Sequence, residues 1–230
     1  MAYSFANFKT YLKIIFKRRD DLESIDSVNL YGIWTNAAYK DLTTKHRFWG
    51  LRYNFFFPQL ETSDDSQSTS DGVAYVDVPS DALIIRGVFD ETSDLYLNRM
   101  PSIKSYRRKT DRGDTSAEGP PTEWIRSGDY VYLYQTPDTT YSLEIFYKKI
   151  IAALTGTGET VIGTEWDDTI LHLAAYKGFI WLGEYQKADV HKALAMEGME
   201  NLVGVYYEEE KDIKKTLQSG AGVKDYSFNG

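Results

Sequence analysis

The sequence predicts an α+β fold in which helices from both ends of the chain form one bundle and an antiparallel β-sheet or sandwich is inserted between them. Hydrophobic residues recur every three or four positions near both ends, whereas they alternate with a period of two between residues 52 and 148. Neither helical part is long enough to enclose a core alone, so we expect the two to pack together. The expected organisation is N-terminal helices at 1–50, an inserted β-domain at 51–150, C-terminal helices at 151–218 that pack against 1–50, and a flexible tail at 219–230.

The first 50 residues predict two helices followed by a bulky apolar segment. Between residues 4 and 19, aromatic and aliphatic side chains are three or four positions apart, and Ser4 can cap the helix. The basic run Lys17-Arg18-Arg19 is then expected at the helix end, where the helix dipole favours cations. A second helix is expected over residues 27–46. The apolar plug that follows, Phe48 to Leu51, is of the kind that docks a helix onto the next domain.

The middle of the sequence alternates between short strand-like segments and turns. The polar segments 61–72 and 111–121 are expected to be loops, because they are rich in Asp, Ser, Thr and Gly. Residues 102–109 follow Pro101 and predict one or two helical turns. Strands are expected over residues 52–57, 72–78, 82–89, 94–97, 122–126, 130–135 and 141–148, the last two joined by a turn at 136–139.

The helical period returns after a glycine–threonine linker at 156–163. One helix is expected over residues 164–181 and a last one over about 188–217. Gly198 and Gly204 lie within the last helix, where each costs about 1 kcal/mol relative to alanine. We therefore expect close packing against another helix, or a bend, near these glycines.

Composition excludes several classes of protein. The 230 residues include 26 Lys and Arg against 34 Asp and Glu, for a net charge of −8, with 3 His and no Cys. The absence of cysteine excludes a disulfide-linked scaffold, a cysteine-ligated metal site and a thiol nucleophile. The acidic balance argues against a protein whose main role is to bind phosphate backbones. The 18 tyrosines suit half-buried strands and interfaces.

No sequence motif for catalysis is found. Phosphate-binding, dinucleotide-binding, serine-hydrolase and zinc-protease patterns are all missing. The acidic runs Asp64-Asp65, Asp167-Asp168 and Glu208-Glu209-Glu210 are adjacent in sequence, which points neighbouring carboxylates in different directions. Asp167 and Asp168 are better explained by compensation of the dipole at a helix start. We therefore assign no catalytic residue, no cofactor and no metal.

One basic cluster stands out, at Lys104, Arg107, Arg108, Lys109 and Arg112, beside Tyr106. It is either a positively charged segment that contacts a phosphate backbone or an acidic partner, or an ordinary solvated loop. The predicted tail contains isolated aromatic residues of the kind that anchor a tail on a partner. The candidate partner-binding residues are Arg107, Arg108, Lys109, Arg112, Tyr226 and Phe228.

Aromatic residues on the predicted strands allow a second kind of binding. Trp124, Tyr130, Tyr132 and Tyr134 could stack on sugars, although burial in a core or an interface explains the same residues.

The order of segments as a whole resembles the head–tail adaptor proteins of tailed bacteriophages. The likeness covers about residues 20 to 215 and depends on the order of elements more than on any single motif. The segments that carry it are Arg47-Phe48-Trp49-Gly50-Leu51, the strand from Val73 to Asp81, Gly119 to Trp124, Tyr130 to Gln135, Tyr141 to Lys148, and Ala174 to Gly178 in the C-terminal helices.

This resemblance implies a virion structural protein without enzymatic activity. Its copies would form a ring, usually of roughly twelve, docked to the portal protein on one side and to tail or tail-completion proteins on the other. DNA would pass through the centre without sequence-specific binding. The resemblance thus implies a virion protein that is assembled in the host cytoplasm.

Two other classes of function stay open. One is a carbohydrate- or receptor-binding β-module of a phage fibre or baseplate, and the other is a small hydrolase that uses two converging carboxylates. The start of the sequence lacks the pattern of an export signal, and no run approaches the roughly 18 apolar residues of a membrane span. We therefore expect no membrane association, and expect the protein to stay in the compartment where it is made.

Overall fold

The computed structural model describes residues 3–23, 28–45, 47–53, 55–111 and 118–220, with side chains in the long last helix as far as residue 203. The chain divides into two compact units, one made of Met1–Pro58 with Ile151–Gly230 and the other of Gln59–Ile150. Helices dominate the first, the helical unit, and strands dominate the second, the β-unit. The predicted α+β class is confirmed.

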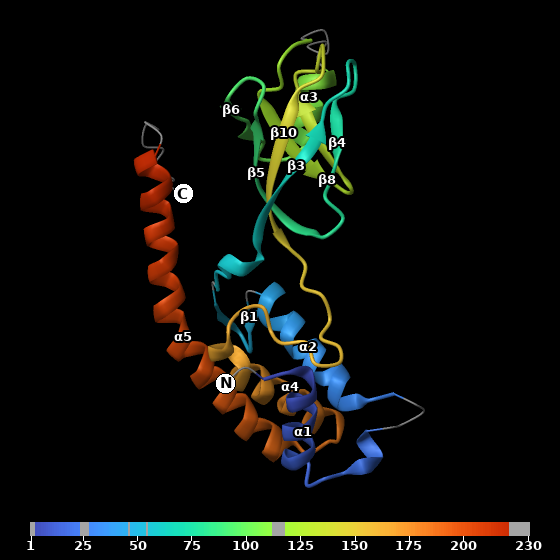
Figure 1. The fold of residues 1–230 in the computed structure, drawn as a ribbon, viewed down its shortest axis with the longest axis vertical. Coiled ribbons are helices and arrows are strands. Elements are labelled where there is room, and N and C mark those ends of the chain that lie inside the picture. Colours follow the sequence, from blue (N-terminus) through green and yellow to red (C-terminus); the bar gives the residue numbers. More distant parts are fainter. Residues whose placement is uncertain (1–2, 24–27, 46, 54, 112–117, 221–230) are drawn as a thin grey trace. The chain divides into compact units, whose positions relative to one another are not determined.

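The helical unit is built from helices of both chain ends (Figure 1). Its described elements are α1 Phe5–Ile15, η1 Asp20–Leu22, α2 Leu30–Thr44, the two-residue strands β1 Arg47–Phe48 and β2 Leu51–Arg52, η4 Thr164–Trp166, α4 Asp167–Trp181 and α5 Tyr185–Gly220. α2 packs against α1 and α4, and α4 also packs against α5. Aromatic rings fill the centre, where the ring of Phe16 lies 4.3 Å from that of Phe179 and 5.3 Å from that of Trp34.

Side-chain caps and backbone conformation set the limits of the first two helices. Ser4 accepts a hydrogen bond from the Asn7 backbone N–H at 3.2 Å, as predicted, and Asn29 caps α2. The expected basic run directly follows the C-terminal cap of α1, Phe16. Lys17 and Arg18 have φ angles of 58° and 56°, so the chain turns in the left-handed region at these cations, and their N–H groups donate to carbonyls of the last helical turn.

The aromatic segment after α2 differs from the prediction. The apolar plug is a hairpin of β1 and β2, with Trp49 and Gly50 both at positive φ in its turn. The expected strand over residues 52–57 is wrong for the described residues 53 and 55–57, which lie outside any strand. Its alternation reflects burial, because Phe55 and Phe57 pack against Trp166, at 4.8 and 5.2 Å between ring centres.

The predicted linker at 156–163 is tied to the helices by hydrogen bonds. The Phe5 backbone N–H donates to the Gly158 carbonyl at 2.8 Å, and the Val161 N–H donates to the Tyr39 hydroxyl at 2.9 Å. Just before it, the Leu154 N–H donates to Asn36 at 2.7 Å. Polar side chains of α2 thus hold this segment in place.

Two glycines allow the helices to approach closely. A Cβ added at Gly198 would lie 2.3 Å from the Thr169 hydroxyl, which confirms close packing of α5 against another helix at this position. A Cβ at Gly178 would lie 2.5 Å from Phe16 Cζ and 2.8 Å from Trp34 Cε3. These are impossible separations, so α4 needs glycine where α1 and α2 meet it.

The β-unit is a sandwich of two four-stranded sheets (Figure 1). In spatial order, one sheet contains β3 Glu61–Ser68, β10 Ser142–Lys149, β5 Ala82–Asp90 and β6 Leu95–Tyr96, and the other contains β4 Tyr75–Asp77, β9 Tyr130–Tyr134, β8 Glu123–Ser127 and β7 Asn98–Arg99. Apolar residues from both sheets share one core, with Trp124, Leu133, Leu143 and Ile145 nearly inaccessible to solvent. Pairing is antiparallel except between β7 and β8, which run parallel. The unit also contains η2 Pro58–Leu60, at its boundary, and α3 Ile103–Asp111.

The expected loop at 61–72 is wrong over most of its length. Residues 61–68 form β3, an edge strand paired with β10. Its Asp and Glu residues have low strand propensity, but partners supplied from roughly 80 residues away in sequence outweigh that local preference. The segment 136–139 joins β9 to β10, which belong to different sheets. Residues 112–117 of the predicted loop at 111–121 lie outside the described residues.

Replacing Gly178 by alanine should destabilise the helical unit. The two rings that lie at the Cβ position cannot move away freely, because Phe16 packs against Phe179 and Trp34 packs against Tyr31 and Trp181. We expect Gly178→Ala to lower the free energy of unfolding by about 1–3 kcal/mol, the usual cost of overpacking. Urea denaturation measures this, with Glu197→Ala, at an exposed position of α5, as the control. Equal stability of Gly178→Ala and the wild type would contradict the close packing.

Candidate functional site

Helix α3 presents a basic face on the surface of the β-unit. Ser102 stands before it and accepts a hydrogen bond from the Ser105 N–H at 3.2 Å. Arg107 and Arg108 lie three and four positions after Lys104, so both share one side of the helix with it. All three side chains are exposed, and none has an ion pair with a described residue.

The opposite side of α3 attaches the helix to the second sheet. Lys109 Nζ lies 2.5 Å from Glu123 Oε2 of β8 and 4.6 Å from the centre of the Tyr134 ring of β9. The Tyr106 ring lies 5.5 Å from that of Tyr132, and burial raises the pKa of Tyr106. Among the candidate residues, Lys109 therefore has partners inside the unit, whereas Arg107 and Arg108 point outward.

A row of tyrosines continues this surface. Tyr75 of β4 and Tyr130 of β9 meet edge to face at 4.8 Å, and they are 46% and 40% exposed. Tyr132 lies beside both, at 6.1 and 6.2 Å. Trp124, which the sequence also offered for sugar stacking, is 1% exposed and belongs to the core. Only the tyrosines are therefore available for contact with another molecule.

Acidic side chains gather along β3 and along the segment that leads from β3 through β4 to β5. Residues 61–81 contain six Asp and Glu and no Lys or Arg. Asp65 and Asp71 are exposed, whereas Asp64 accepts hydrogen bonds from Ser66 and Gln67 that lower its pKa. Because the Asp64 carboxylate is held by its own strand, the pair Asp64-Asp65 lacks the converging geometry of a catalytic dyad.

The acidic pair at the start of α4 has a structural role. Asp167 is 2% exposed and accepts hydrogen bonds from the Tyr3 N–H at 2.7 Å and the Thr160 hydroxyl at 2.8 Å. Burial raises the pKa of Asp167, although both hydrogen bonds oppose the change. Asp168 accepts from the Tyr3 hydroxyl, which raises the pKa of Tyr3 to about 12. The pair lies in the first helical turn, as expected, and also fastens the chain start.

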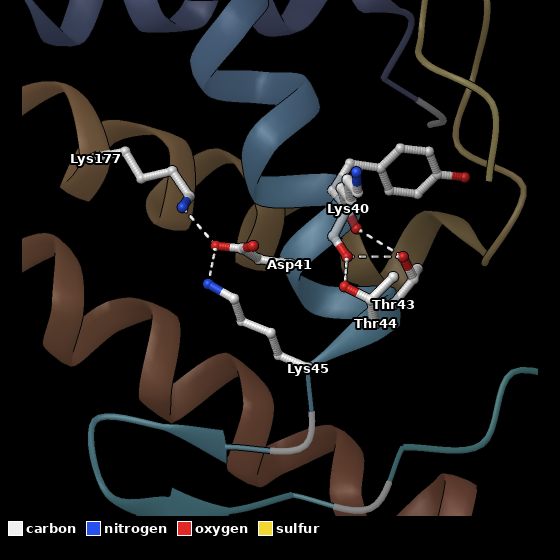
Figure 2. Close-up of polar contacts among 7 residues, drawn as sticks. Lys40, Asp41, Thr43, Thr44, Lys45 and Lys177 are labelled. Carbon is white, nitrogen blue, oxygen red and sulfur yellow. Dashed lines mark hydrogen bonds and ion pairs between the residues drawn. The ribbon is translucent and has the colours of Figure 1, made fainter. Parts of the chain in front are cut away.

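A half-buried carboxylate of α2 holds two lysines (Figure 2). Asp41 Oδ2 lies 2.5 Å from Lys177 Nζ of α4 and 2.8 Å from Lys45 Nζ. Burial alone would raise the pKa of Asp41, but the hydrogen bonds from Lys177 and Lys45 outweigh burial and lower it. The ion pair joins α2 to α4 through two residues, Asp41 and Lys177, that are 136 positions apart in sequence. Sequence reasoning could not detect it, because no local pattern links these residues.

Two histidines meet between α4 and α5. His172 Nδ1 lies 3.1 Å from His191 Nδ1, and Phe179 stacks on the His191 ring at 5.3 Å. Burial lowers the pKa of both histidines, and the His172 charge lowers that of His191 further. Over the described part of the chain, no group of three or more His, Asp and Glu is placed to hold a metal ion.

One end of the helical unit exposes large apolar side chains beside a shallow cavity. Trp181 and Tyr185, at the α4–α5 junction, are 57% and 65% exposed. The neighbouring cavity of about 220 Å³ is lined by Ile15, Phe16, Lys17, Arg19, Phe179, Leu182, Glu184 and Lys187. Exposed aromatic residues of this kind are typical of protein contacts more than of enzyme sites.

The remaining candidate residues are not placed by the structure. Arg112, Tyr226 and Phe228 lie outside the described residues, as do the side chains of Glu208 to Glu210. Over the part of the chain that is described, no helix combines the length and apolar character needed to cross a membrane.

Comparison with known proteins decides between the open classes of function. A protein-family model described as SU10 adaptor protein matches residues 9–215, which include both units. The chain belongs to the SU10 adaptor protein family. Comparison with curated proteins finds no match.

Membership of this family makes the chain a bacteriophage adaptor and a component of the virion. An SU10 adaptor associates with other virion components, and structural adaptors of this kind are typically not enzymes. The recognised likeness to phage head–tail adaptors is thus confirmed at the level of the family. The surfaces described above are therefore best considered as contact surfaces.

Removing the Asp41 carboxylate should weaken the α2–α4 contact. Asp41→Asn leaves Lys177 partly buried without its counter-ion, and we expect a loss of about 1–3 kcal/mol in the free energy of unfolding. The folded-state pKa of Asp41 is lowered, so the wild-type stabilisation is present above the unfolded pKa of 3.8 and is lost as the pH falls through the folded pKa. Denaturation of both proteins at neutral pH and at acidic pH measures the difference. Asp20→Asn, which breaks an exposed pair with Lys13, is the matched control and should change stability little.

The histidine pair should make the helical unit sensitive to mild acid. A hydrogen bond between two imidazoles needs one unprotonated nitrogen. Because both folded-state pKa values are lowered from 6.5, the unfolded chain binds more protons below that value, and stability falls as the pH falls. Thermal unfolding between pH 7.5 and pH 5.5 should show this drop, and His172→Gln/His191→Gln should remove at least half of it. If the double variant lost as much thermal stability between pH 7.5 and pH 5.5 as the wild type does, the assignment of the acid sensitivity to the histidine pair would be refuted.

Proposed function

We propose that this protein forms a closed ring of roughly twelve copies below the portal, where it joins the capsid to the tail. The observation that carries the proposal is the family match, which extends over most of the helical unit and the whole β-unit. A ring subunit needs two different complementary faces. The β-unit is suited to this, because the exposed cations of α3 and the exposed acids Asp65 and Asp71 belong to separate elements of the unit.

We further propose that DNA passes through the centre of this ring without sequence-specific binding. The net charge of −8 supports this role, since an acidic wall repels phosphate and lets DNA slide. A strongly basic wall would instead retain the genome. Portal and tail or tail-completion proteins are the proposed partners on the two sides of the ring.

Arg107 and Arg108 are the candidate partner-binding residues that the structure leaves exposed. Arg112, Tyr226 and Phe228 stay predictions from the sequence. Lys109 is assigned to holding α3 in place, because its ammonium group already contacts Glu123 and Tyr134.

Assembly with the portal tests the proposed function. We expect mass photometry and electron microscopy of the purified chain mixed with the portal protein of the same phage to show a ring of adaptor copies on the portal. Phage particles made without this protein should be DNA-filled heads that lack tails. A protein that stays monomeric or trimeric beside the portal, and that binds glycans instead, would contradict the adaptor ring and support the fibre or baseplate module.

A further inference from the structure

The β-unit carries two small surfaces of opposite charge. The basic ridge consists of Lys104, Arg107 and Arg108 on α3, and the acidic edge consists of Asp65 on β3 and Asp71 in the following turn. Helix α3 contacts β8 and β9, whereas β3 pairs with β10 in the other sheet. The ridge and Asp65 therefore belong to different sheets of the sandwich, whereas Asp71 lies in the turn that leads from β3 to β4 of the second sheet.

The basic ridge lacks partners within the described part of the chain. The nearby acid Glu123 is already engaged by Lys109, so it does not neutralise the outward-facing cations. Three cations on one side of a helix repel one another, and a negative surface placed against them would relieve this repulsion. The exposed rings of Tyr75 and Tyr130 continue the same face through Tyr132. Tyrosine and arginine together are typical of contact surfaces between proteins.

The acidic edge has the complementary character. β3 is an outer strand of its sheet, paired on one side with β10. Asp65 and Asp71 are exposed and have no ion pair with a described residue. Charged residues on an edge strand prevent uncontrolled pairing of the strand with another sheet. The same charges can direct a specific partner to this edge.

We propose that the basic ridge of one copy binds the acidic edge of the next copy, so that the subunits associate head to tail. This inference rests on the proposed ring and names the contact that closes it. A contact between two different surfaces leaves one of each unused at the ends, so it repeats until a ring closes. A two-fold dimer through either surface would instead bring like charges together.

DNA is a less suitable occupant of the basic ridge. In residues 59–150, sixteen Asp and Glu outnumber ten Lys and Arg, so a DNA strand near the ridge would also meet many carboxylates. Three cations release few counterions from a phosphate backbone and give only weak binding. Another copy of this acidic chain supplies the required negative charge without a phosphate backbone.

Charge reversal of each surface tests the contact. In the portal assembly assay, we expect Arg107→Glu/Arg108→Glu, and separately Asp65→Lys/Asp71→Lys, to reduce the fraction of protein in rings at least about tenfold, because like charges then face each other. Arg47→Glu/Arg52→Glu is the matched control. It reverses the same charge at two exposed arginines of the β1–β2 hairpin and should leave assembly intact.

Mixing the two reversed variants is the decisive experiment. Each then offers a surface that complements the other, so an equal mixture should assemble although neither variant assembles alone. Thermal unfolding verifies that both variants fold. Analytical ultracentrifugation without portal detects the pairwise contact independently of the ring.

The possible failures are distinguishable. If the wild type forms rings and the arginine variant forms them equally well, the ridge–edge contact is wrong and the ring is retained. Equal loss of assembly in the control, or no recovery in the mixture, also overturns the contact. Normal rings that lose affinity for double-stranded DNA would assign the ridge to DNA instead. If the wild type forms no rings on the portal, the proposed ring is refuted. If the equal mixture of the two reversed variants then also shows no association by analytical ultracentrifugation, the ridge–edge contact is refuted as well.

Discussion

The close approach of Phe16 and Trp34 to the bare backbone of Gly178 is the contact on which the helical unit depends. These rings come from the first part of the chain, and the glycine comes from the last part. A two-part unit of this kind has no covalent link at the contact, so non-covalent contacts, with close packing among them, must hold the parts together. The ion pair between Asp41 and Lys177 acts across the same pair of segments and adds orientation to the packing.

Charges in this protein follow two different rules. Where side chains are partly or fully buried, as at Asp41 and Asp167, each carboxylate has named hydrogen-bond donors, which is what burial of charge requires. Where side chains are exposed on the β-unit, some charges pair locally, as Arg86 does with Glu61. The cations of the basic ridge and the acids of the acidic edge have no such ion pair with a described residue, so they stay available for contacts with other molecules.

The sequence predicts the helices and most strands because their signal is local. Hydrophobic period, the Ser4 cap and the role of Gly198 as a packing site all follow from neighbouring residues. The failures have a different origin. β3 looks like a loop until β10 pairs with it, and the aromatic segment containing Phe55 and Phe57 looks like a strand because it alternates, although its rings are buried beside Trp166. In both cases a partner distant in sequence decides the structure, and no local pattern reveals that partner.

The same distinction applies to the candidate site. The basic cluster was visible in the sequence, but only the fold separates Lys109, which holds α3 against the sheet, from Arg107 and Arg108, which face solvent. The acidic edge could not be recognised from the sequence either, because the local pattern of residues 61–72 predicts a loop. The position of Asp65 depends on the pairing of β3 with β10. An adaptor works through surfaces, and a surface is defined by residues that the fold brings together. For such a protein, topology adds more to functional inference than motifs do, since the chemistry of each residue is ordinary and its placement is specific.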